Sequence, residues 1–393
     1  TDRRRHEVVL RGSVAAAWPV RLEGALHRER IRDRFDNPDA EVGLGRSATD
    51  NRTSDGGHRL SAGWILPPLG QQLRVTRQDR IERWTPHDRL RDTIGFTRRR
   101  EHRTVSVEDR TSLWRIEAEA AYHWARATDN YAGPVGWGQP VGPSPDRTRR
   151  FESPVFGLRA DCGGGLVLKG NRGRMTRFPS FPELFGQNGV QEGNPSLKNE
   201  TGHQWDAGLS WSPRLPLRLE SAYFESVTRD KITLIQNSQR TVKAQNVDRA
   251  WVRGIETSAF TSLAVPGAGE VDLQVSHTWQ EARDLGKSRT YRDKKLPNLP
   301  DREAYVALDF RRAAWKLRWD LSARSAHFRD RVNSAAKRTP PSTIHGTALE
   351  RSFLDGSLAA RVEVRNVFDR RVEDIDGFPL PGRSFGAAIT WSP

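Results

Sequence analysis

The sequence predicts an all-β protein, an antiparallel transmembrane β-barrel with about 17 strands. Three observations predict this fold class. Apolar and polar residues alternate with a period of two, short and long links between the predicted strands alternate, and no apolar run reaches the roughly 18 residues that a membrane-spanning helix needs. No segment shows a convincing helical period, so almost no helix is expected.

The composition argues against a soluble protein with a large apolar core. Of the 393 residues, 35% are hydrophobic and 29% are charged, and the mean hydropathy is −0.73. Intrinsic disorder would match this polarity, but 13 Trp and 15 Phe are more aromatic residues than disordered chains carry. We therefore expect an ordered protein in which strands, rather than helices, cross a membrane.

Alternation of apolar and polar side chains defines the strands. Val271, Leu273 and Val275 lie on one side of a predicted strand, whereas Asp272 and Gln274 lie on the other. The apolar face of such a strand turns inward in a soluble sandwich and outward to lipid in an outer-membrane barrel. Four further segments repeat the pattern: 116–124, 205–211, 315–321 and 358–364.

Repetition of such strands predicts a series of hairpins. Trp205, Trp211 and Trp315 stand at strand ends, as expected of an aromatic girdle at a membrane interface. The hairpins are predicted near 7–30, 57–84, 92–126, 155–172, 203–226, 250–281, 302–325 and 342–366, followed by a last strand at 384–391.

The lengths of the links favour the barrel. Tight links such as Pro213-Arg214 and Asp355-Gly356 alternate with long polar connections. A barrel with short periplasmic turns on one rim and long external loops on the other produces this alternation, whereas a sandwich has no reason to keep it. The predicted external loops are 31–56, 127–153, 173–202, 227–249, 282–301, 326–341 and 367–382.

The net charge of +15 comes mainly from Arg. A basic protein suggests nucleic-acid binding, but the Arg residues are spread over the whole chain and alternate with acidic residues, as in 28–34. We therefore expect a solvated surface of mixed charge and no nucleic-acid partner. The single cysteine, Cys162, excludes an internal disulfide and a cysteine-based zinc site.

Motifs for catalysis or cofactor binding are absent from the sequence. Asp374-Ile375-Asp376-Gly377 lacks the remaining ligands of a calcium loop, and Gly286-Lys287-Ser288 lacks the first glycine of a phosphate-binding loop. No H-E-x-x-H or G-x-S-x-G segment occurs, and the ten His residues are scattered. The sequence predicts no enzyme and no bound cofactor or metal.

The most specific motif lies between residues 177 and 200. Its two parts, R-F-P-S-F-P-E-L-F-G at 177–186 and G-N-P-S-L-K-N-E at 193–200, are similar to the segment R-x-P-x-x-x-E-L-[YF]-G … G-N-P-x-L-x-x-E of TonB-dependent outer-membrane receptors. From about residue 170 the chain therefore resembles the C-terminal barrel of this family. Shorter matches follow in family order at 246–247, 253–256, 296–300, 366–369 and 377–383. The matching residues include Arg177, Pro179, Glu183, Leu184, Gly193, Asn194, Pro195, Glu200, Gly254, Glu256, Asn366, Pro381, Gly382 and Arg383.

The resemblance implies an outer-membrane receptor of a Gram-negative bacterium, which takes up a scarce nutrient such as a ferric siderophore, haem or cobalamin. Members of the family carry an N-terminal plug domain and a TonB-contacting segment ahead of a barrel of about 22 strands. Nothing in the chain resembles the plug, so residues 1–393 are expected to form a partial barrel domain that lacks the plug and the first strands. The tight link at Ala17-Trp18-Pro19 agrees with this assignment, because the first predicted strand is then followed by a short periplasmic turn.

The resemblance also implies partners for the complete receptor, which is expected to be a monomer. They are the TonB complex, reached through the missing N-terminal segment, outer-membrane lipid and lipopolysaccharide, and a small metal-chelate ligand. Arg residues of the predicted external loops are candidates for attracting an anionic ligand or lipopolysaccharide phosphate. These are Arg147, Arg149, Arg150, Arg289 and Arg292.

Two other functions are compatible with parts of the sequence. A passive porin-like channel would share the alternation and the loop pattern, but it would not explain the motif at 177–200. A soluble basic β-protein that binds nucleic acid would require the polar faces of the strands to be outside. Whether the apolar faces of the strands point outward or inward therefore distinguishes a membrane protein from a soluble one.

Overall fold

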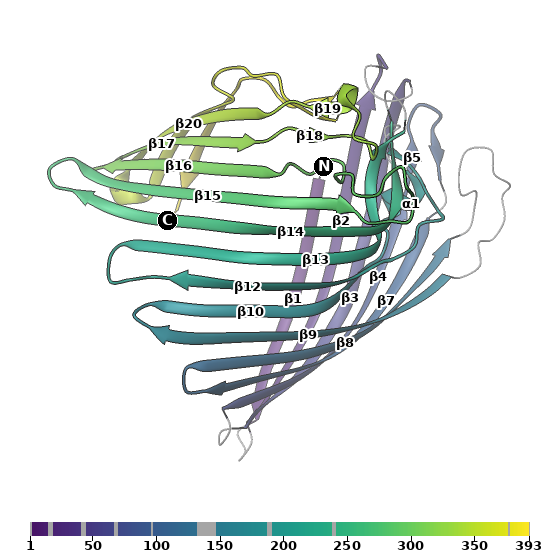
Figure 1. Ribbon diagram of the computed structural model, residues 1–393, viewed down its shortest axis with the longest axis horizontal. Coiled ribbons are helices and arrows are strands. Elements are labelled where there is room, and N and C mark those ends of the chain that lie inside the picture. The colour runs from purple at the N-terminus through teal and green to yellow at the C-terminus, as the bar shows by residue number, and fades with distance from the viewer. Residues whose placement is uncertain are drawn as a thin grey trace. The chain divides into compact units, whose positions relative to one another are not determined.

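The chain folds into two compact units in a computed structural model (Figure 1). The first unit comprises Thr1–Arg159, Asn171–Gln204 and Thr228–Val247, and the second comprises Ala160–Gly170, Trp205–Val227 and Asp248–Pro393. The structure describes residues 2–14, 19–40, 45–66, 70–95, 97–131, 147–186, 191–237, 241–375 and 378–392.

Strands, nearly all of them antiparallel, hold most of the described residues. They form seventeen strands of eight or more residues and seven strands of two or three residues. The prediction of about 17 strands and almost no helix is therefore confirmed, because the only α-helix among the described residues, α1, has five residues (Phe181–Phe185). Within the described part of the chain, no helix is long and apolar enough to cross a membrane.

The first unit is built from long hairpins that pair in chain order. Strand β2 (Val20–Asn37) pairs with β3 (Ser47–Leu66) without interruption, from Val20 opposite Trp64 to Asn37 opposite Ser47. Five strands, β9, β10 and β12 to β14, contribute residues to both units. The other elements are β1 (Asp2–Val14), β4 (Gln71–Thr85), β5 (His87–Asp88), β6 (Thr93–Ile94), β7 (Arg98–Leu113), β8 (Ile116–Tyr131), β9 (Arg147–Gly163), β10 (Leu166–Arg177), β11 (Gln191–Glu192), β12 (Glu200–Trp211), β13 (Leu217–Gln236) and β14 (Val242–Val265).

The second unit continues the same pattern of antiparallel hairpins. Strand β17 (Trp315–Arg324) pairs with β16 (Arg302–Arg312) on one side and β20 (Ser342–Phe353) on the other. The remaining elements are β15 (Gly269–Asp284), β18 (His327–Phe328), β19 (Arg338–Thr339), β21 (Leu358–Arg365), β22 (Glu373–Ile375), β23 (Phe378–Pro379), β24 (Ser384–Trp391) and the 3-10 helices η2 (Ala335–Lys337) and η3 (Leu354–Gly356).

Each unit has an apolar face and a polar face, and the apolar face is the exposed one. Large side chains at alternate positions of β24 stay open to the surroundings, with Phe385 77%, Ile389 79% and Trp391 71% exposed. Charged side chains on the opposite face pair with one another, as Arg59 does with Glu23 at 3.0 Å. This arrangement is that of a membrane barrel and excludes a soluble sandwich, whose apolar face would be buried.

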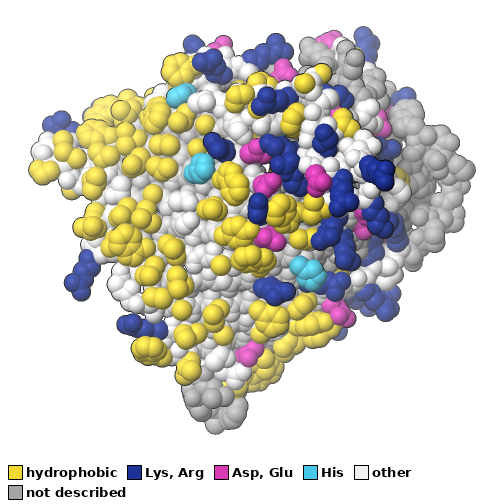
Figure 2. All heavy atoms as spheres, viewed as in Figure 1, with side chains coloured by type: hydrophobic (Ala, Val, Ile, Leu, Met, Phe, Trp, Pro, Cys, Tyr) yellow, Lys and Arg dark blue, Asp and Glu magenta, His cyan; other side chains and the backbone are white. Residues whose placement is uncertain are grey.

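Space-filling Figure 2 shows the same division on one side of the molecule. Hydrophobic side chains gather toward the strand ends that are joined by short links, and Lys and Arg side chains gather toward the other ends. The largest cluster of buried hydrophobic residues in the described chain has only four members, Leu184, Leu197, Ile232 and Ala244. The protein therefore gains little stability from a central apolar core.

Short and long links alternate as predicted except at one place, and the strands extend into the predicted loops. The exception is the loop predicted at 227–249: only 237–241 joins β13 to β14, which is no longer than the link 212–216 between β12 and β13. Strand β2 ends at Asn37 and β3 begins at Ser47, so the link predicted at 31–56 is only 38–46. Charged residues such as Arg32 and Arg34 continue the strand because β2 stays paired with β3 there, and the Arg32 side chain reaches Asp50 of β3 at 2.5 Å. Ala17 and Trp18 of the predicted first tight link, and Asp376 and Gly377, lie outside the described residues.

Candidate functional site

An ion-pair centre at Arg177 organises the motif segment 177–200 in the first unit. Arg177 ends β10, and its Nη1 donates to both carboxylate oxygens of Glu183 at 3.0 and 3.1 Å. Its Nη2 donates to Glu200 Oε1 at 2.8 Å. The three charged residues that the sequence motif shares with the family thus meet at one point, and the segment between them folds back on the end of β10.

The protonation of Arg177 is fixed by this contact. Burial by itself would lower the pKa of Arg177, but the hydrogen bonds and charges of Glu200 and Glu183 outweigh it and raise the pKa above its ordinary value. Arg177 lies nine residues beyond Leu168, the exposed apolar residue of β10, and so outside the apolar part of that strand. Arg177 therefore stays charged at this centre.

Helix α1 owes its position to a capping box. The Ser180 side chain accepts from the Glu183 backbone N–H at 3.4 Å, and the Glu183 carboxylate accepts from the Ser180 N–H at 2.7 Å. Pro182 lies in the first turn, where its missing N–H costs nothing. Gly186 ends the helix at φ 85°, a conformation that disfavours a side chain. Glu183 therefore serves both the helix cap and the Arg177 centre.

A small apolar cluster joins α1 to the strands behind it. Leu184 and Leu197 are fully buried and pack with Ile232 and Ala244. Glu200 contributes to the same connection, because its Oε1 also accepts from the Ile232 N–H at 2.6 Å. The motif residues Leu184 and Glu200 thus attach the segment to β13 by packing and by hydrogen bonding together.

Gly193 and Asn194 fix the return of the chain. A Cβ on Gly193 would lie 2.7 Å from Gly186 N and from Leu184 O, so no side chain fits there. The Asn194 amide donates to Ala244 O at 2.8 Å. Asn246, from the next short match, donates to Asp230 O at 2.6 Å. These contacts explain why glycine stands at 193 and asparagine at 194 and 246 in the two matches.

An aromatic and cationic platform on the polar face receives α1. The Trp84 ring stacks on Phe181 and Phe185, with ring centroids 6.3 and 6.1 Å apart. Arg98 lies over the Phe185 ring at 4.7 Å and Arg100 over the Phe181 ring at 5.0 Å. Trp84, Arg98 and Arg100 were not predicted from the sequence. Their alternate positions in β4 and β7, which place them on one face, are the only sequence signal that points to them.

Asp129 connects Arg100 of this platform to a second buried cation, Arg149. It is 1% exposed and forms ion pairs with both Arg100 and Arg149. Arg149 is itself buried, and its Nη2 lacks a hydrogen-bond partner among the described residues. Arg147 reaches toward the motif segment, with Nη1 3.4 Å from Pro195 O. A basic site therefore lies beside α1 at the end of the strands that carry long links.

The five candidate ligand Arg residues occupy different places. Arg147 and Arg149 lie on the polar face of β9 beside the motif segment. Arg150, in the same strand, is exposed on the opposite face. Arg289 and Arg292 belong to the second unit, where Arg292 is exposed and lies 3.9 Å from Asp293. The structure thus brings only two of the five candidates together.

The later family matches are structural contacts of the second unit. A Cβ on Gly254 would meet the Phe224 ring at 2.7 Å, so the close packing requires glycine. Asp369 accepts from the Arg383 N–H at 2.7 Å, and a Cβ on Gly382 would lie 2.8 Å from the same carboxylate. The matches at 366–369 and 377–383 therefore contact each other. Asn366 donates to Pro381 O at 3.4 Å, and Glu256 is exposed opposite Thr278 in β15.

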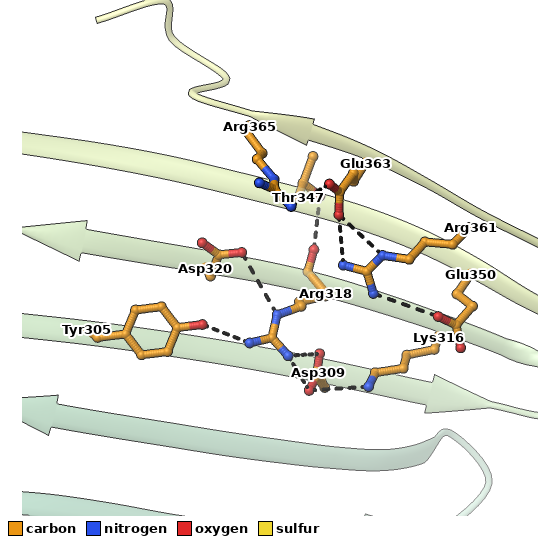
Figure 3. A network of polar contacts seen from close by, with 10 residues as sticks. All are labelled: Tyr305, Asp309, Lys316, Arg318, Asp320, Thr347, Glu350, Arg361, Glu363 and Arg365. Carbon is orange, nitrogen blue, oxygen red and sulfur yellow. Dashed lines mark hydrogen bonds and ion pairs between the residues drawn. The ribbon is translucent and has the colours of Figure 1, made fainter. Parts of the chain in front are cut away.

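A network of charged side chains covers the polar face of the second unit (Figure 3). Asp309 lies 3.2 Å from Arg318 and 3.6 Å from Lys316, and Arg318 donates to the Tyr305 hydroxyl at 2.7 Å. Such a face is suited to water or to another polar surface and not to lipid. Asp320, Glu350, Arg361, Glu363 and Arg365 complete the network. Thr347, which lies opposite Trp319 on the other face, donates to the backbone carbonyl of Arg318 at 3.0 Å.

The site offers cationic groups for a ligand and no assembled metal centre. In the described part of the chain, no group of three His, Cys, Asp or Glu side chains is placed to hold a metal ion. The chemistry available at the α1 platform is therefore charge-assisted hydrogen bonding from guanidinium groups, which suits anionic oxygen atoms.

Comparison with known proteins agrees with the motif and the fold. The family model of the TonB dependent receptor-like β-barrel matches residues 2–367. No curated protein matches the chain. Solved structures similar to the chain include the copper transporter OprC, with 16% identity, a TM-score of 0.75, and coverage of 98% of this chain and 65% of that one.

Two receptors for iron compounds are similar in the same way. The siderophore receptor PiuA from Acinetobacter baumannii has 12% identity and a TM-score of 0.74, with coverage of 99% of this chain and 64% of that one. The ferric citrate transporter FecA has 15% identity and a TM-score of 0.70, with coverage of 98% and 61%. The chain thus spans less than two thirds of the length of each of these proteins. Because the family model covers most of its length, the chain belongs to the TonB-dependent receptors and is a β-barrel protein of the Gram-negative outer membrane.

Proposed function

We propose that the chain forms the barrel wall and external loops of a receptor that imports a metal chelate with energy delivered by TonB. The chelate is of the ferric siderophore, haem or cobalamin class, and TonB contacts a segment outside this chain. The receptor works as a monomer in outer-membrane lipid and lipopolysaccharide. In this proposal the polar faces line the passage and the motif segment 177–200 holds the external end of that passage in shape.

The observation that supports a ligand role is the excess of cations at the α1 platform. Arg100 and Arg149 both pair with the carboxylate of Asp129, and Arg149 keeps one buried NH2 group without a partner among the described residues. A buried cation that is incompletely paired is costly, and an anionic ligand would compensate it. The platform lies on the polar face, at the strand ends with long links, where an incoming ligand arrives first.

This charge favours a cargo that presents anionic oxygen atoms. Ferric siderophores and ferric citrate present carboxylate or phenolate oxygens, which guanidinium groups bind with strong hydrogen bonds. Two of the similar structures are a siderophore receptor and a ferric citrate transporter. We therefore propose an anionic ferric chelate as the cargo.

A binding and uptake experiment on the full-length receptor tests the proposal. A panel of radiolabelled ferric chelates is offered to cells that have no other receptor for them, with and without TonB. We expect binding of an anionic chelate in both strains and uptake only in the strain with TonB. Uptake that persists without TonB, or an open conductance of the reconstituted receptor, contradicts the proposal and supports a passive channel.

Neighbouring arginines on opposite faces of β9 provide matched variants. Arg149→Gln removes the incompletely paired guanidinium, and we expect it to weaken chelate binding by about tenfold or more. Arg150→Gln makes the same charge change on the exposed apolar face, and binding should not change. Equal losses in both variants would show that the α1 platform is not the binding site.

A further inference from the structure

A pocket opens on the polar face of the first unit, near strand ends that are joined by short links. Its volume is about 380 Å³, and β1, β2, β3 and β4 all contribute to its lining. The links 15–19 and 67–70 join these strand ends, and the short turns of outer-membrane barrels are periplasmic. Cavities of this size hold small molecules, so the pocket is a candidate binding site at the periplasmic end of the polar face.

Gly63 forms the floor of this pocket between two arginines. It lies opposite Arg21 of β2 and opposite Arg74 of β4, so the three residues form one row across three strands. A Cβ on Gly63 would meet no atom closer than 3.8 Å. The missing side chain therefore leaves room for a ligand between two guanidinium groups. We name this site the arginine pocket and define it by Arg21, Ser61, Gly63, Gln72 and Arg74.

The acidic residue that lines the pocket does not neutralise these two arginines. Glu23 pairs instead with Arg11 at 3.1 Å and with Arg59 at 3.0 Å. Arg21 and Arg74 form no ion pair or hydrogen bond with any residue that the structure describes. The pocket thus carries two cations that are available to a ligand.

The neighbouring strand β7 also leaves Arg74 available. Glu108 lies opposite Arg74 in that strand, but its carboxylate accepts from the Ser106 hydroxyl at 3.4 Å. Neither Ser61 nor Gln72 forms a side-chain hydrogen bond within the described part of the chain. The hydroxyl and the amide therefore add neutral donors beside the two guanidinium groups.

We propose that the arginine pocket binds a small polycarboxylate, with one carboxylate group at Arg21 and another at Arg74. Guanidinium groups bind carboxylates through paired hydrogen bonds. The Cα atoms of the two arginines are about 10 Å apart, which is twice the spacing of neighbouring strands. Two carboxylates of one molecule span this separation better than a single phosphate ion does, and the volume of the pocket also exceeds what one phosphate needs.

The arginine pocket differs from the α1 platform in place and in character. The platform lies at the strand ends with long links and contains the buried cations Arg100 and Arg149, whereas Arg21 and Arg74 are exposed at the other end of the polar face. In the proposed function this face lines the passage, so the pocket lies near the periplasmic end of that passage. The inference rests on this passage and is independent of which chelate is transported.

Citrate binding to the full-length receptor in mild detergent, measured by isothermal titration calorimetry, tests the proposal. All proteins carry Arg149→Gln, so that the α1 platform contributes as little as possible. Arg21→Gln with Arg74→Gln removes both cations of the pocket. Arg30→Gln with Arg83→Gln is the matched control, because it removes two exposed charges from the other face of the same strands β2 and β4.

A third variant, Gly63→Val, keeps both charges but fills the floor of the pocket. The backbone has room for the new Cβ, and valine suits a strand, so the variant should fold like the parent. We expect it to weaken citrate binding by about tenfold or more. Citrate binding that is unchanged in Gly63→Val would show that the arginines act at a distance and that no ligand sits between them, which overturns the proposal.

We expect the double glutamine variant of the pocket to weaken citrate binding by about thirtyfold and the control to bind like the parent. Arg21→Lys with Arg74→Lys should keep part of the binding, which shows that the glutamine variant fails for lack of charge and not of fold. Equal affinity in the two glutamine variants, or competition by inorganic phosphate at the concentration of citrate, overturns the proposal. A receptor that binds citrate in this way but takes up no ferric chelate contradicts the proposed function alone.

Discussion

Arg177 and Glu200 are 23 residues apart in sequence, and a 2.8 Å hydrogen bond joins Arg177 Nη2 to Glu200 Oε1. The same Glu200 oxygen accepts from the Ile232 backbone N–H. One carboxylate thus holds the end of β10, the start of β12 and strand β13 together. This geometry makes Glu200 the residue on which the folded motif segment depends most.

Glu200→Gln is expected to lower the free energy of unfolding by about 1–3 kcal/mol, because the amide keeps the contact to Ile232 but loses the charge opposite Arg177. Urea unfolding of the full-length receptor in lipid vesicles measures the change. Glu117→Gln, which breaks an exposed pair with Arg159, is the control and should have little effect. A Glu200 variant as stable as this control would remove the argument for the Arg177 centre.

Gly254→Ala is expected to destabilise the second unit by about 1–3 kcal/mol, since the new methyl group would overlap Trp279 O and the Phe224 ring. The fraction that stays folded in a heat-dependent gel shift measures this effect. Gly12→Ala is the matched control in a strand, because a Cβ there meets nothing within 4 Å. The close-packing explanation fails if the two variants behave alike.

Arg331 connects two predicted external loops of the second unit. It donates to Asp284 at 2.7 Å and lies 4.0 Å over the Tyr291 ring, while Asn333 and Lys295 exchange two hydrogen bonds. Arg331→Ala should therefore increase hydrogen exchange in both 285–301 and 326–341 by about tenfold.

Arg292→Ala provides the control for this experiment, because Arg292 is exposed and its pair with Asp293 is 3.9 Å long. Its exchange pattern should match that of the parent protein. If Arg331→Ala accelerates exchange in 326–341 alone, the two loops are not coupled in the way the contacts indicate.

Leu317→Arg should cost about 2–4 kcal/mol of stability in lipid, because the charge enters hydrocarbon on the apolar face of β17. Ser322→Arg places the same side chain on the polar face of the same strand and should cost much less. Unfolding in vesicles compares the two. A larger loss for Ser322→Arg would mean that the lipid-facing side has been assigned wrongly.

Much of the fold was predictable because strand periodicity is a local signal. Val271, Leu273 and Val275 identify their strand without reference to any other part of the chain, and the tight links fix which strands form hairpins. The strand ends were less predictable. Arg32 and Asp50 belong to strands rather than to a loop because each pairs across the sheet, and no local pattern shows this.

The candidate site was only partly predictable. The motif residues Arg177, Glu183 and Glu200 were identified from the family resemblance, and the structure brings them together. Helix α1 was missed because a five-residue helix shows no periodicity, and its capping box lies within a segment expected to be a loop. Asp129 was missed because its burial depends on side chains from distant strands.

The orientation of the strand faces toward lipid is measured most directly by fluorescence quenching. Cys162 is replaced by Ser, a single cysteine is placed at position 317 or 322 of the full-length receptor, and each is labelled with a polarity-sensitive dye in vesicles that contain brominated lipid. We expect strong quenching and a blue-shifted emission at position 317, and weak quenching with a water-like emission at position 322. The reverse pattern would show that the polar face of β17, and not its apolar face, meets the lipid.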